Sequence, residues 1–387
     1  MTDQASKFDF EGTNQSGVRE RNERLVLSIL RREGPLPKAE IARRTGLSAQ
    51  TASVIMRALE SDGLIAKGEK VRGRVGQPSV PMSLAPDGAY FFGLSVGRRS
   101  VELILTNFIG EEITHRRESY AYPLPSNVLD FVQSAADEIL QDLEPAQADR
   151  ISGMGIAIPF FLWDWAVTIG ADPEKMDHWK NFDLRNELSK LFEFPIYLGN
   201  DASCACGAEL VFGVAETPAD FLYIYFGHFI GGGVVMNGSL YKGSSGNAGA
   251  IGPFPINGRQ MVDVASLNGL ERRLIEAKGS AAEIVEKNEN WNLDAKILED
   301  WLAEAVPAVT RMITGAISII DFPAVLIDGN LPTDLREVLV DRITTELKNE
   351  NLAGLVVPQI LEGSMGPKAR PMGAVSLPLA KRYMLEA

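Results

Sequence analysis

The stretch FFGLSVGRRSVELIL, from Phe91 to Leu105, decides the fold of this 387-residue chain. Two alternating apolar runs flank a short turn, which predicts a β-hairpin. A glycine at such a turn lets the backbone approach a partner closely, and that partner is often a phosphate. Here the turn contains one glycine, Gly97, followed by Arg98 and Arg99, and no carboxylate stands in the strand before it. The turn is therefore an intact phosphate loop, a remnant of one, or an ordinary hairpin.

Beyond this hairpin, strand-like and helical stretches alternate, which predicts an α/β body. The strand-like stretches are FFGLSVG, VELILTNF, ISGMGIAIPF, FPIYLGND, FLYIYFG and AVLIDGN. Helical patterns cover residues 127–143, 183–193, 202–213 and 287–320. Two blocks, 91–105 and 221–240, each begin with a strand, a glycine turn and another strand. This repetition indicates an internal duplication that produces two lobes with a cleft between them.

Length and composition limit the class of protein. A chain of 387 residues is too long for one hydrophobic core, and 45% hydrophobic with 23% charged residues is typical of a soluble globular protein. No uninterrupted apolar run reaches about 18 residues, so we expect no membrane span. The polar N-terminal stretch matches neither a secretory signal nor a transit peptide. The only two cysteines, Cys204 and Cys206, are too close together to link domains, so we expect a cytoplasmic protein.

The charge is distributed unevenly. The chain has a net charge of −13, but residues 18–80 contain thirteen Lys or Arg against seven Asp or Glu, a net of +6. The remainder therefore carries −19. A basic N-terminal unit joined to an acidic body indicates a nucleic-acid-binding domain fused to a domain of different function.

The basic unit has the spacing of a helix-turn-helix. Residues 21–34 and 38–46 have helical patterns, a Thr-Gly-Leu-Ser turn follows, and Ser48 can cap a third helix over 48–63. Two strands around a glycine-rich, arginine-bearing tip then form a wing; a plain helical hairpin with a charged face is the alternative. Small polar side chains suit base edges, whereas the wing arginines suit phosphates or a narrow minor groove. The predicted DNA-binding residues are Ser48, Gln50, Thr51, Ser53, Arg57, Arg72, Arg74 and Gln77.

Two stretches of the acidic body carry candidate chemistry. In LGNDASCACGAE, residues 198–209, Asn200 and Asp201 follow an apolar strand at a strand-to-helix junction. Polar groups at strand ends in open α/β sheets are the usual place for a ligand, although either residue can instead be a helix cap. The second stretch is the run Gly231–Gly233, which lies against a phosphate or makes a tight hairpin.

The order of these motifs resembles the ROK family, named for repressors, open reading frames and kinases, in its branch of sugar-responsive transcriptional regulators. The motifs are the winged helix-turn-helix, GIAIP, GNDAS, FGHFIGGGVVMNGSLYKGSSGNAGAIG and MGAVSLPLA. The resemblance implies an actin-like (ribonuclease H-like) two-lobed body of the sugar-kinase type, with sugar in the cleft and a C-terminal helix that returns to the first lobe. The expected domains are a disordered tail 1–17, a winged helix-turn-helix 18–86, a first lobe 87–195 joined by 366–387, and a second lobe 196–365.

The opening turn departs from the family pattern. Family kinases carry an Asp and then Gly-Gly-Thr there, to position phosphates and metal, whereas this chain has the segment 95–99, Ser-Val-Gly-Arg-Arg. Phosphoryl transfer depends on positioning and electrostatics, so we expect a remnant of a phosphate loop, no bound ATP and no enzyme activity. Asp201 matches the family's catalytic base, but a base without positioned ATP does no kinase chemistry. It is expected to accept a sugar hydroxyl instead.

The family's zinc site is also missing its ligands. Family members read AGE-x-GH followed by a cysteine cluster that binds zinc with that histidine, whereas here the block 248–253 is Ala-Gly-Ala-Ile-Gly-Pro with no cysteine after it. Structural zinc needs four nitrogen or sulfur donors, and His228 with Cys204 and Cys206 is not placed to replace them. We therefore expect no zinc, and we expect both cysteines to be packed in the core.

This chain also has fewer of the family's sugar-binding side chains. The Glu and His that would grip sugar hydroxyls are Ala250 and Pro253, and a further family glutamate has no match around residues 262–263. Fewer polar groups imply weaker binding or a different molecule. The predicted ligand-binding residues are Pro159, Phe160, Asn200, Asp201, Asn247 and Gly249. The aromatic residues in 160–165 either stack on the ligand or belong to the core.

The sequence thus predicts a sugar-responsive DNA-binding regulator, most simply a repressor, with an inactive body. A ligand would change lobe closure and with it the spacing of paired DNA-binding units in a homodimer or homotetramer on two-fold operator DNA. The expected partners are double-stranded DNA and a sugar or sugar derivative, without a membrane. Two alternatives stay open: an active ATP-dependent sugar kinase carrying a DNA-binding domain, and a ligand-independent DNA-binding protein whose cleft has decayed.

Overall fold

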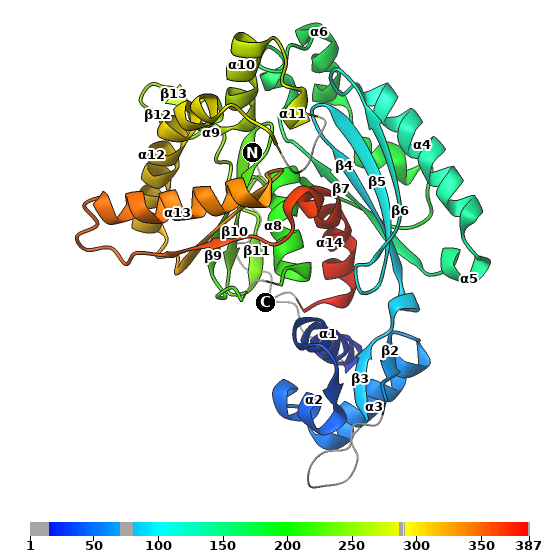
Figure 1. Ribbon diagram of the computed structural model, residues 1–387. Coiled ribbons are helices and arrows are strands. Elements are labelled where there is room, and N and C mark those ends of the chain that lie inside the picture. The colour runs from blue at the N-terminus through cyan, green and yellow to red at the C-terminus, as the bar shows by residue number, and fades with distance from the viewer. Residues whose placement is uncertain (1–14, 70–79, 215, 286–288, 290, 386–387) are drawn as a thin grey trace, which may run out of the picture. The chain divides into compact units, whose positions relative to one another are not determined.

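The structure of the protein is a computed structural model that describes residues 15–69, 80–214, 216–285, 289 and 291–385 (Figure 1). The chain divides into two compact units: one runs through Gly88 and includes a C-terminal piece from Ala380 on, and the other runs from Ala89 to Leu379. Residues 1–14 of the predicted tail lie outside the described residues. Its remaining residues, 15–17, belong to the first helix, so the tail prediction was too long by that much.

The first unit is a winged helix-turn-helix, as predicted. Three helices and three short strands build it: α1 Gln15–Glu33, β1 Leu36–Pro37, α2 Lys38–Thr45, α3 Ala49–Ser61, β2 Ile65–Lys67 and β3 Pro81–Leu84. The strands form an antiparallel sheet in the order β1-β3-β2. Its small core is made of the apolar faces of the three helices: Val26, Leu30, Ile41, Ala52, Ile55, Met56 and Leu59.

The turn between α2 and α3 follows the Thr-Gly-Leu-Ser prediction. Gly46 ends α2 with φ of 68°, a left-handed conformation that glycine adopts without a Cβ penalty. Ser48 then caps α3, because its hydroxyl oxygen accepts a hydrogen bond from the backbone nitrogen of Thr51 at 3.1 Å. These two residues fix the direction in which α3 leaves the turn.

The second unit contains two five-stranded sheets with the same strand order. The first is β6 Glu112–Ser119, β5 Ser100–Asn107, β4 Tyr90–Val96, β7 Ile151–Ile158 and β8 Ile196–Asn200; the second is β11 Ser239–Tyr241, β10 Ile230–Met236, β9 Phe221–Phe226, β14 Ala324–Gly329 and β15 Gln359–Glu362. In each, the first three strands are antiparallel and the last two join in parallel. This repetition confirms the predicted hairpin and the predicted duplication. It also corrects the lobe boundary after 195, since β8 pairs with β7 and so belongs to the first sheet.

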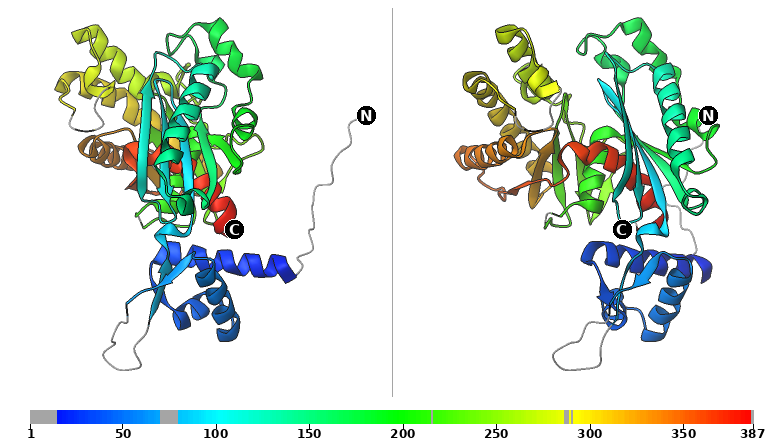
Figure 2. Two further views of the ribbon diagram at one scale, coloured as in Figure 1. Left: turned by 90° about the vertical axis from the view of Figure 1, so that its right-hand side faces the viewer. Right: turned by 45° about the vertical axis from the view of Figure 1, so that its right-hand side comes forward.

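The larger helices cover these sheets (Figures 1 and 2). Helix α4 Pro125–Asp142 packs on the outer face of the first sheet. Helices α12 Ala295–Ile319 and α13 Thr333–Asn349 pack on the second. Helix α12 begins later than the predicted 287 because Asp294 caps it at Lys296. The predicted helices at 127–143, 183–193 and 202–213 correspond to α4, α7 and α8.

Short elements complete the second unit. The helices are α5 Pro145–Ala148, α6 Pro173–Met176, α7 Leu184–Ser189, α9 Met261–Ala265, α10 Leu267–Lys278 and α11 Ala282–Val285. A two-stranded ribbon, β12 Pro255–Ile256 with β13 Arg259–Gln260, and the single turns Leu162–Trp165, Asp177–Asn181 and Gly366–Lys368 lie between them. A further turn, Pro86–Gly88, ends the first unit.

Helices α8 Asp201–Phe212 and α14 Ala369–Tyr383 lie between the two sheets and meet them at glycines. A Cβ at Gly155 of β7 would lie 1.8 Å from the Ala374 carbonyl oxygen of α14. A Cβ at Gly373 would lie 2.1 Å from the Cys204 carbonyl oxygen of α8. The predicted return of the C-terminal helix to the first lobe is thus confirmed for α14 up to Leu379. The residues from Ala380 on group with the N-terminal unit instead.

The glycine triplet serves the same close packing. A Cβ at Gly231 would lie 2.6 Å from the Ala202 side chain, and a Cβ at Gly233 would lie 2.4 Å from the Cys206 side chain. All three glycines belong to strand β10, which forms a hairpin with β9 through a short turn at 227–229. They thus lie in the strand after the predicted hairpin turn and not in the turn itself, and contact with a phosphate stays a prediction. Cys206 and its neighbour Cys204 are free and buried, as predicted.

Helix α12 is long and apolar enough to cross a membrane by length and composition alone. Its apolar side chains, among them Trp301 and Val309, are buried in the core of the second lobe. The indole nitrogen of Trp301 donates to the Ser266 carbonyl oxygen at 3.2 Å. A core helix of this kind has the same composition as a membrane span, so the sequence of α12 is explained by its packing.

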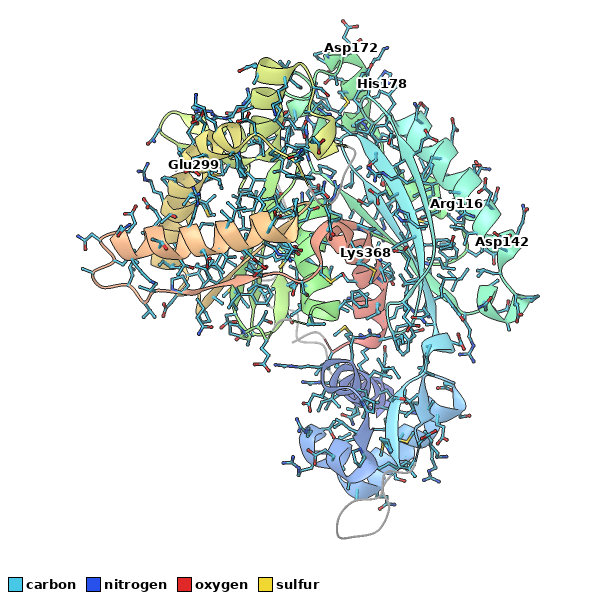
Figure 3. All side chains as sticks on the ribbon, viewed as in Figure 1. Arg116, Asp142, Asp172, His178, Glu299 and Lys368 are labelled. Atoms are coloured by element: carbon cyan, nitrogen blue, oxygen red, sulfur yellow. The ribbon has the colours of Figure 1, made fainter. Side chains whose placement is uncertain are left out.

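Surface ion pairs contribute little to the stability of the second unit. Arg116 of β6, for example, lies 3.2 Å from Glu138 and 3.8 Å from Asp142 of α4, and all three side chains are exposed by about a third or more (Figure 3). Pairs of this kind contribute about 0–1 kcal/mol each. The buried cores and the helix contacts at glycines therefore hold the body together.

Two buried carboxylates connect stability to pH. Glu209 of α8 accepts hydrogen bonds from the backbone nitrogen and the hydroxyl of Ser364, both at 2.8 Å. Asp328 of β14 accepts from the Tyr223 hydroxyl at 2.8 Å and from the Gly366 nitrogen at 3.0 Å. Burial raises the pKa of each carboxyl group above its ordinary value, although these hydrogen bonds lower it.

A raised pKa in the folded state means that protonation favours folding. The contribution of Glu209 is complete below its unfolded-state pKa of about 4.3 and is lost as the pH rises through the folded-state pKa. We expect the difference in free energy of unfolding between the wild type and Glu209→Gln to fall as the pH rises from 4 toward 7. Urea denaturation of both proteins across this range measures the difference, and a difference that grows with pH would contradict the assignment.

Candidate DNA-binding face and ligand site

The exposed face of α3 contains the residues predicted to read DNA. Gln50, Thr51 and Arg57 are exposed and Ser53 is half-buried. Val54, which the sequence analysis missed, is 49% exposed on the same helix. An apolar side chain among polar ones suits the methyl group of thymine. Its position opposite the apolar face that Ala52, Ile55 and Leu59 share was the available signal in the sequence.

The other predicted DNA-binding residues have different positions. The hydroxyl of Ser48 lies 2.8 Å from the Thr51 hydroxyl and caps the helix, so its side chain is already engaged. Arg72, Arg74 and Gln77 of the wing lie outside the described residues.

The arginines near the turn between α2 and α3 differ in whether they are available to contact DNA phosphates. Arg43 and Arg44 of α2 both pair with Glu40, and these two guanidinium groups hold the pKa of Glu40 at about 2. Among the described residues, the guanidinium of Arg57 contacts only a backbone atom, through a hydrogen bond from Nε to the Ser53 carbonyl oxygen at 3.3 Å. Arg57 is therefore the exposed cation of α3 that is available for a phosphate.

In the second unit, Asn200 and Asp201 stand where β8 meets α8, as predicted. The side-chain oxygen of Asn200 accepts from the backbone nitrogens of Ala202 at 3.1 Å and Ser203 at 3.2 Å, so Asn200 is the N-cap of α8. Asp201, in the first turn, is half-buried, and its carboxylate has no hydrogen bond within the described ranges. Of the two predicted roles, cap and ligand contact, Asn200 thus has the first, and Asp201 is free for the second.

The backbone of the Gly97 turn is hydrogen-bonded, and a side chain fills the space beside it. The backbone nitrogen of Gly97 donates to the Ser100 carbonyl oxygen at 2.8 Å, and the Tyr120 hydroxyl contacts the carbonyl oxygens of both residues at 2.7 and 2.9 Å. A Cβ at Gly97 would lie 3.0 Å from Nη1 of Arg370, at the start of α14. The guanidinium of Arg370 therefore fills the space beside the turn.

The two arginines of the turn reach the second lobe, Arg98 at the equivalent turn between β9 and β10 and Arg99 at helix α10. The guanidinium carbon of Arg98 lies 3.7 Å from the ring centroid of Phe229, a cation–π contact. Arg99 forms an ion pair with the buried Glu271 at 3.0 Å, and the other oxygen of Glu271 lies 3.0 Å from Nδ1 of His228. These contacts join the two lobes at the place where a family kinase would need an open phosphate loop.

The electrostatics of this region follow from burial and from a few charges. Burial lowers the pKa of Arg98 to about 10, with the charge of Arg370 adding to the effect and Asp201 opposing it. For Arg370, burial is outweighed by Tyr225, Asp201 and Glu102, which raise its pKa. Burial also lowers the pKa of His228, although Glu271 acts in the opposite direction. The lowered pKa favours a neutral imidazole at neutral pH.

The remaining predicted ligand residues are partly brought together. Phe160 lies against the Gly246 turn, next to the half-buried Asn247, with its ring 3.4 Å from where a Cβ of Gly246 would be. Pro159 is buried. Gly249 packs against β10, since its Cβ would lie 2.8 Å from the backbone of that strand, so its role is close packing.

The neighbouring aromatic residues have mixed roles. Trp165 makes an edge contact with Phe229, with ring centroids 5.1 Å apart, and so belongs to the contact between the lobes. Trp163 is partly buried against the core of the first lobe. Phe161 is 47% exposed, with its ring edge-on to Trp163 at 5.7 Å. Of this group, Phe161 is the one with a free face for a ligand.

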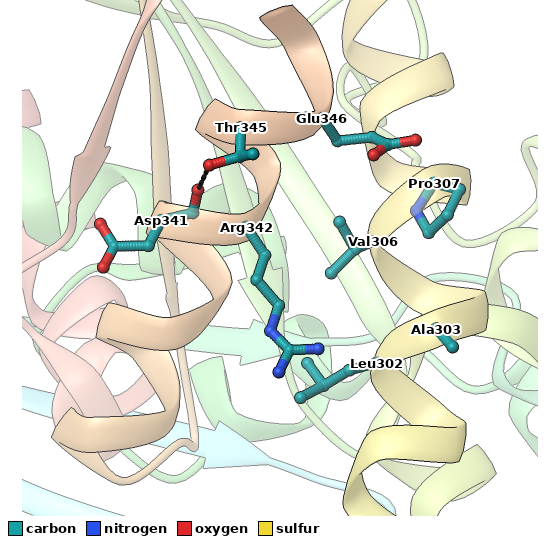
Figure 4. A pocket seen from close by; sticks show the side chains of 8 residues that line it. All are labelled: Leu302, Ala303, Val306, Pro307, Asp341, Arg342, Thr345 and Glu346. Carbon is teal, nitrogen blue, oxygen red and sulfur yellow. Dashed lines mark hydrogen bonds between the residues drawn. The ribbon is translucent and has the colours of Figure 1, made fainter. Parts of the chain in front are cut away.

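A surface hollow lies elsewhere, between α12 and α13 (Figure 4). Its volume is about 380 Å³. It is lined by Leu302, Ala303, Val306, Pro307, Asp341, Arg342, Thr345 and Glu346. None of the predicted ligand residues lines it, so it does not belong to the candidate site.

Within the part of the chain that the structure describes, no group of three or more His, Cys, Asp or Glu side chains is placed to hold a metal ion. His228 is engaged with Glu271 rather than with the cysteines. The absence of zinc stays a prediction that rests on the sequence.

The sequence analysis missed four residues of this site: Arg370, Phe229, Glu271 and Tyr120. Arg370, Phe229 and Glu271 lie far from the Gly97 turn along the chain and reach it through the return of α14 and the packing of the second lobe. Tyr120 reaches it because β6, which it follows, pairs with β5. A charged residue just before the apolar stretch 371–380 of the C-terminal helix was the one available signal, at Arg370.

Comparison with known proteins agrees with this architecture. A model of the ROK family matches residues 91–381, and a model described as winged helix-turn-helix DNA-binding matches residues 19–66. The chain therefore belongs to the ROK family, and it carries a winged helix-turn-helix in front of the ROK body.

Individual relatives and solved structures are similar to this chain over different shares of its length. The chain is 25% identical over 244 residues to the xylose repressor of Bacillus spizizenii, an alignment that covers 63% of this chain and 62% of the repressor. It is similar, with a TM-score of 0.70 and 19% identity, to the crystal structure of a ROK family transcriptional regulator described as a homologue of the MLC protein of E. coli, covering 95% and 98% of the two chains. A ROK family glucokinase from Streptomyces griseus, solved with glucose and AMPPNP, has a TM-score of 0.58 and 18% identity and covers 75% and 99%.

Proposed function

We propose that this protein is a DNA-binding transcriptional regulator that responds to a sugar or sugar derivative and transfers no phosphate. The observation that carries the proposal is the combination, in one chain, of an exposed polar face on α3 with a ROK body whose Gly97 turn is filled by Arg98 and Arg370. The similarity to the xylose repressor and to the ROK transcriptional regulator supports it.

The proposed mechanism uses the contacts between the lobes. A ligand beside Asp201 would change the closure of the lobes. Arg98 and Trp165 join the lobes at Phe229, and Arg99 joins them at Glu271. In a homodimer or homotetramer this closure would alter the spacing of two DNA-binding units on a two-fold operator. The coupling required is modest, about 1–3 kcal/mol.

Two measurements test this function directly. DNA selected from a random duplex pool gives an operator, and release of that DNA by members of a sugar panel gives the response. An assay of ATP consumption with the same panel tests the kinase alternative. Turnover clearly above background would overturn the proposal, and operator binding that no sugar or derivative changes would favour a ligand-independent protein.

An Asp201→Asn variant is expected to lose most of the response to the sugar while keeping its affinity for operator DNA. Removing a charged hydrogen-bond acceptor costs about 1.5–3 kcal/mol, so roughly ten- to a hundredfold more ligand should be needed. Fluorescence anisotropy of labelled operator during a ligand titration measures this. Asp172→Asn, at an exposed cap of α6 where asparagine serves equally well, is the matched control. Loss of operator binding without ligand would instead assign Asp201 a structural role.

A further inference from the structure

Two arginines of the body have buried guanidinium nitrogens without a hydrogen-bond partner among the described residues. Arg98 lies in the β4–β5 turn and Arg370 at the start of α14. The Nε atoms of both are buried and have no hydrogen-bond partner. Across the described residues, neither guanidinium forms an ion pair with a carboxylate. Guanidinium groups normally find oxygen partners when they are withdrawn from water, so both have unused binding capacity.

The nearby carboxylates do not compensate for this charge. Glu271 is shared between Arg99 and His228, each at 3.0 Å. Glu102 lies 3.2 Å from Nε2 of His115 and 4.0 Å from Arg117. Asp201 interacts with the charges of both arginines, and Glu102, which His115 and Arg117 share, interacts with that of Arg370. Neither arginine therefore has a carboxylate to itself, and a guanidinium that is buried without a close counter-ion is costly.

The position of the arginines makes them reachable from the candidate ligand site. Both side chains are half-buried rather than enclosed. The Phe229 ring lies 3.7 Å from the Arg98 guanidinium, and the Arg370 guanidinium lies beside the Gly97 turn, which the Tyr120 hydroxyl contacts. A fixed guanidinium loses little entropy when it binds and presents paired N–H groups that match the two oxygens of a carboxylate or a phosphate.

We propose that the ligand of this site is an anionic sugar derivative, a phosphate ester or a sugar acid, whose anionic group binds Arg98 and Arg370 while Asp201 accepts a hydroxyl. This inference rests on the proposed function, since it names the class of effector for the same site. It also accounts for the missing sugar contacts at Ala250 and Pro253, because a charge-assisted interaction can replace neutral hydrogen bonds.

Calorimetric titration of the full-length protein at constant ionic strength tests the proposal. The probes are inorganic phosphate, glucose 6-phosphate, gluconate and glucose. We expect inorganic phosphate to bind, and either glucose 6-phosphate or gluconate to bind at least tenfold more tightly than glucose. The tighter of these two identifies the phosphate ester or the carboxylate as the anionic group.

Variants connect the binding to the named residues. Arg98→Gln and Arg370→Gln should each weaken the binding of phosphate at least tenfold, whereas Arg116→Gln, which removes an exposed arginine on β6, should leave it unchanged. Asp201→Asn should tighten the binding of inorganic phosphate severalfold, because it removes the negative charge beside the arginines. This gain is a readout that loss of folding cannot imitate.

The outcomes separate this inference from the proposed function. Binding of phosphate that Arg98→Gln and Arg370→Gln do not change, or the absence of binding by every anionic probe, overturns the anionic site. Release of operator DNA by a neutral sugar alone would do the same while leaving the regulator intact. Failure to bind any duplex DNA would overturn the proposed function without touching the titration results.

Discussion

A Gly155→Ala variant is expected to lose about 3 kcal/mol or more of its free energy of unfolding, at the upper end of what overpacking costs. The added Cβ would lie 1.8 Å from the carbonyl oxygen of Ala374, 2.6 Å from its carbonyl carbon and 3.1 Å from the Pro378 ring. These are atoms of a helix backbone and a rigid ring, so no side-chain rotation relieves the clash. Helix α14 as a whole must move away from β7.

Thermal unfolding measures this loss, which should lower the melting temperature by about 6 °C or more. Gly315→Ala, inside α12, is the matched control. The nearest atom to its added Cβ lies 4.0 Å away, and an alanine in a helix is favoured over glycine by about 0.5–1 kcal/mol. The control should be as stable as the wild type or more so. A Gly155→Ala variant with wild-type stability would show that α14 does not hold this position in solution.

The parts of the fold that were predicted from the sequence are those with a local signal. The β4–β5 hairpin follows from alternating residues around Gly97, and the DNA-binding unit follows from the Gly46 turn and the Ser48 cap. The repeated strand order was predictable because two blocks of the chain share one pattern. The placement of β8 was not, since a strand that ends one lobe and a strand that begins the next have the same composition.

The candidate site could be predicted only in part, for a similar reason. Asp201 was found because it stands at a strand end, but Arg370 reaches the Gly97 turn from a segment more than 250 residues away. The packing of the glycine triplet against α8 was not predicted, because glycine allows close approach to a ligand as well as to a helix, and the sequence alone does not distinguish the two. Contacts that depend on packing between distant segments have no signature in one local stretch.

A double variant, Gln50→Ala with Ser53→Ala, is expected to weaken binding to the selected operator by about 2–4 kcal/mol, roughly 30- to 1,000-fold, because hydrogen bonds to base edges supply sequence discrimination. Gln50 is exposed and Ser53 half-buried, and neither side chain has a hydrogen bond to another described residue. Both are therefore available to bases, and truncating them costs the helix little. Binding to unrelated duplex DNA should change by less than threefold, since phosphate contacts carry no sequence information.

The contrast with Arg57→Ala makes this assignment falsifiable. Loss of an exposed cation that contacts phosphate should weaken specific and non-specific binding alike and reduce the slope of log affinity against log salt by about 1. Anisotropy titrations of both variants at several salt concentrations, on operator and on unrelated duplex, separate the two effects. Equal weakening on both DNAs by the double variant would contradict base reading by this face of α3 and would leave the wing, or Val54, as the source of specificity.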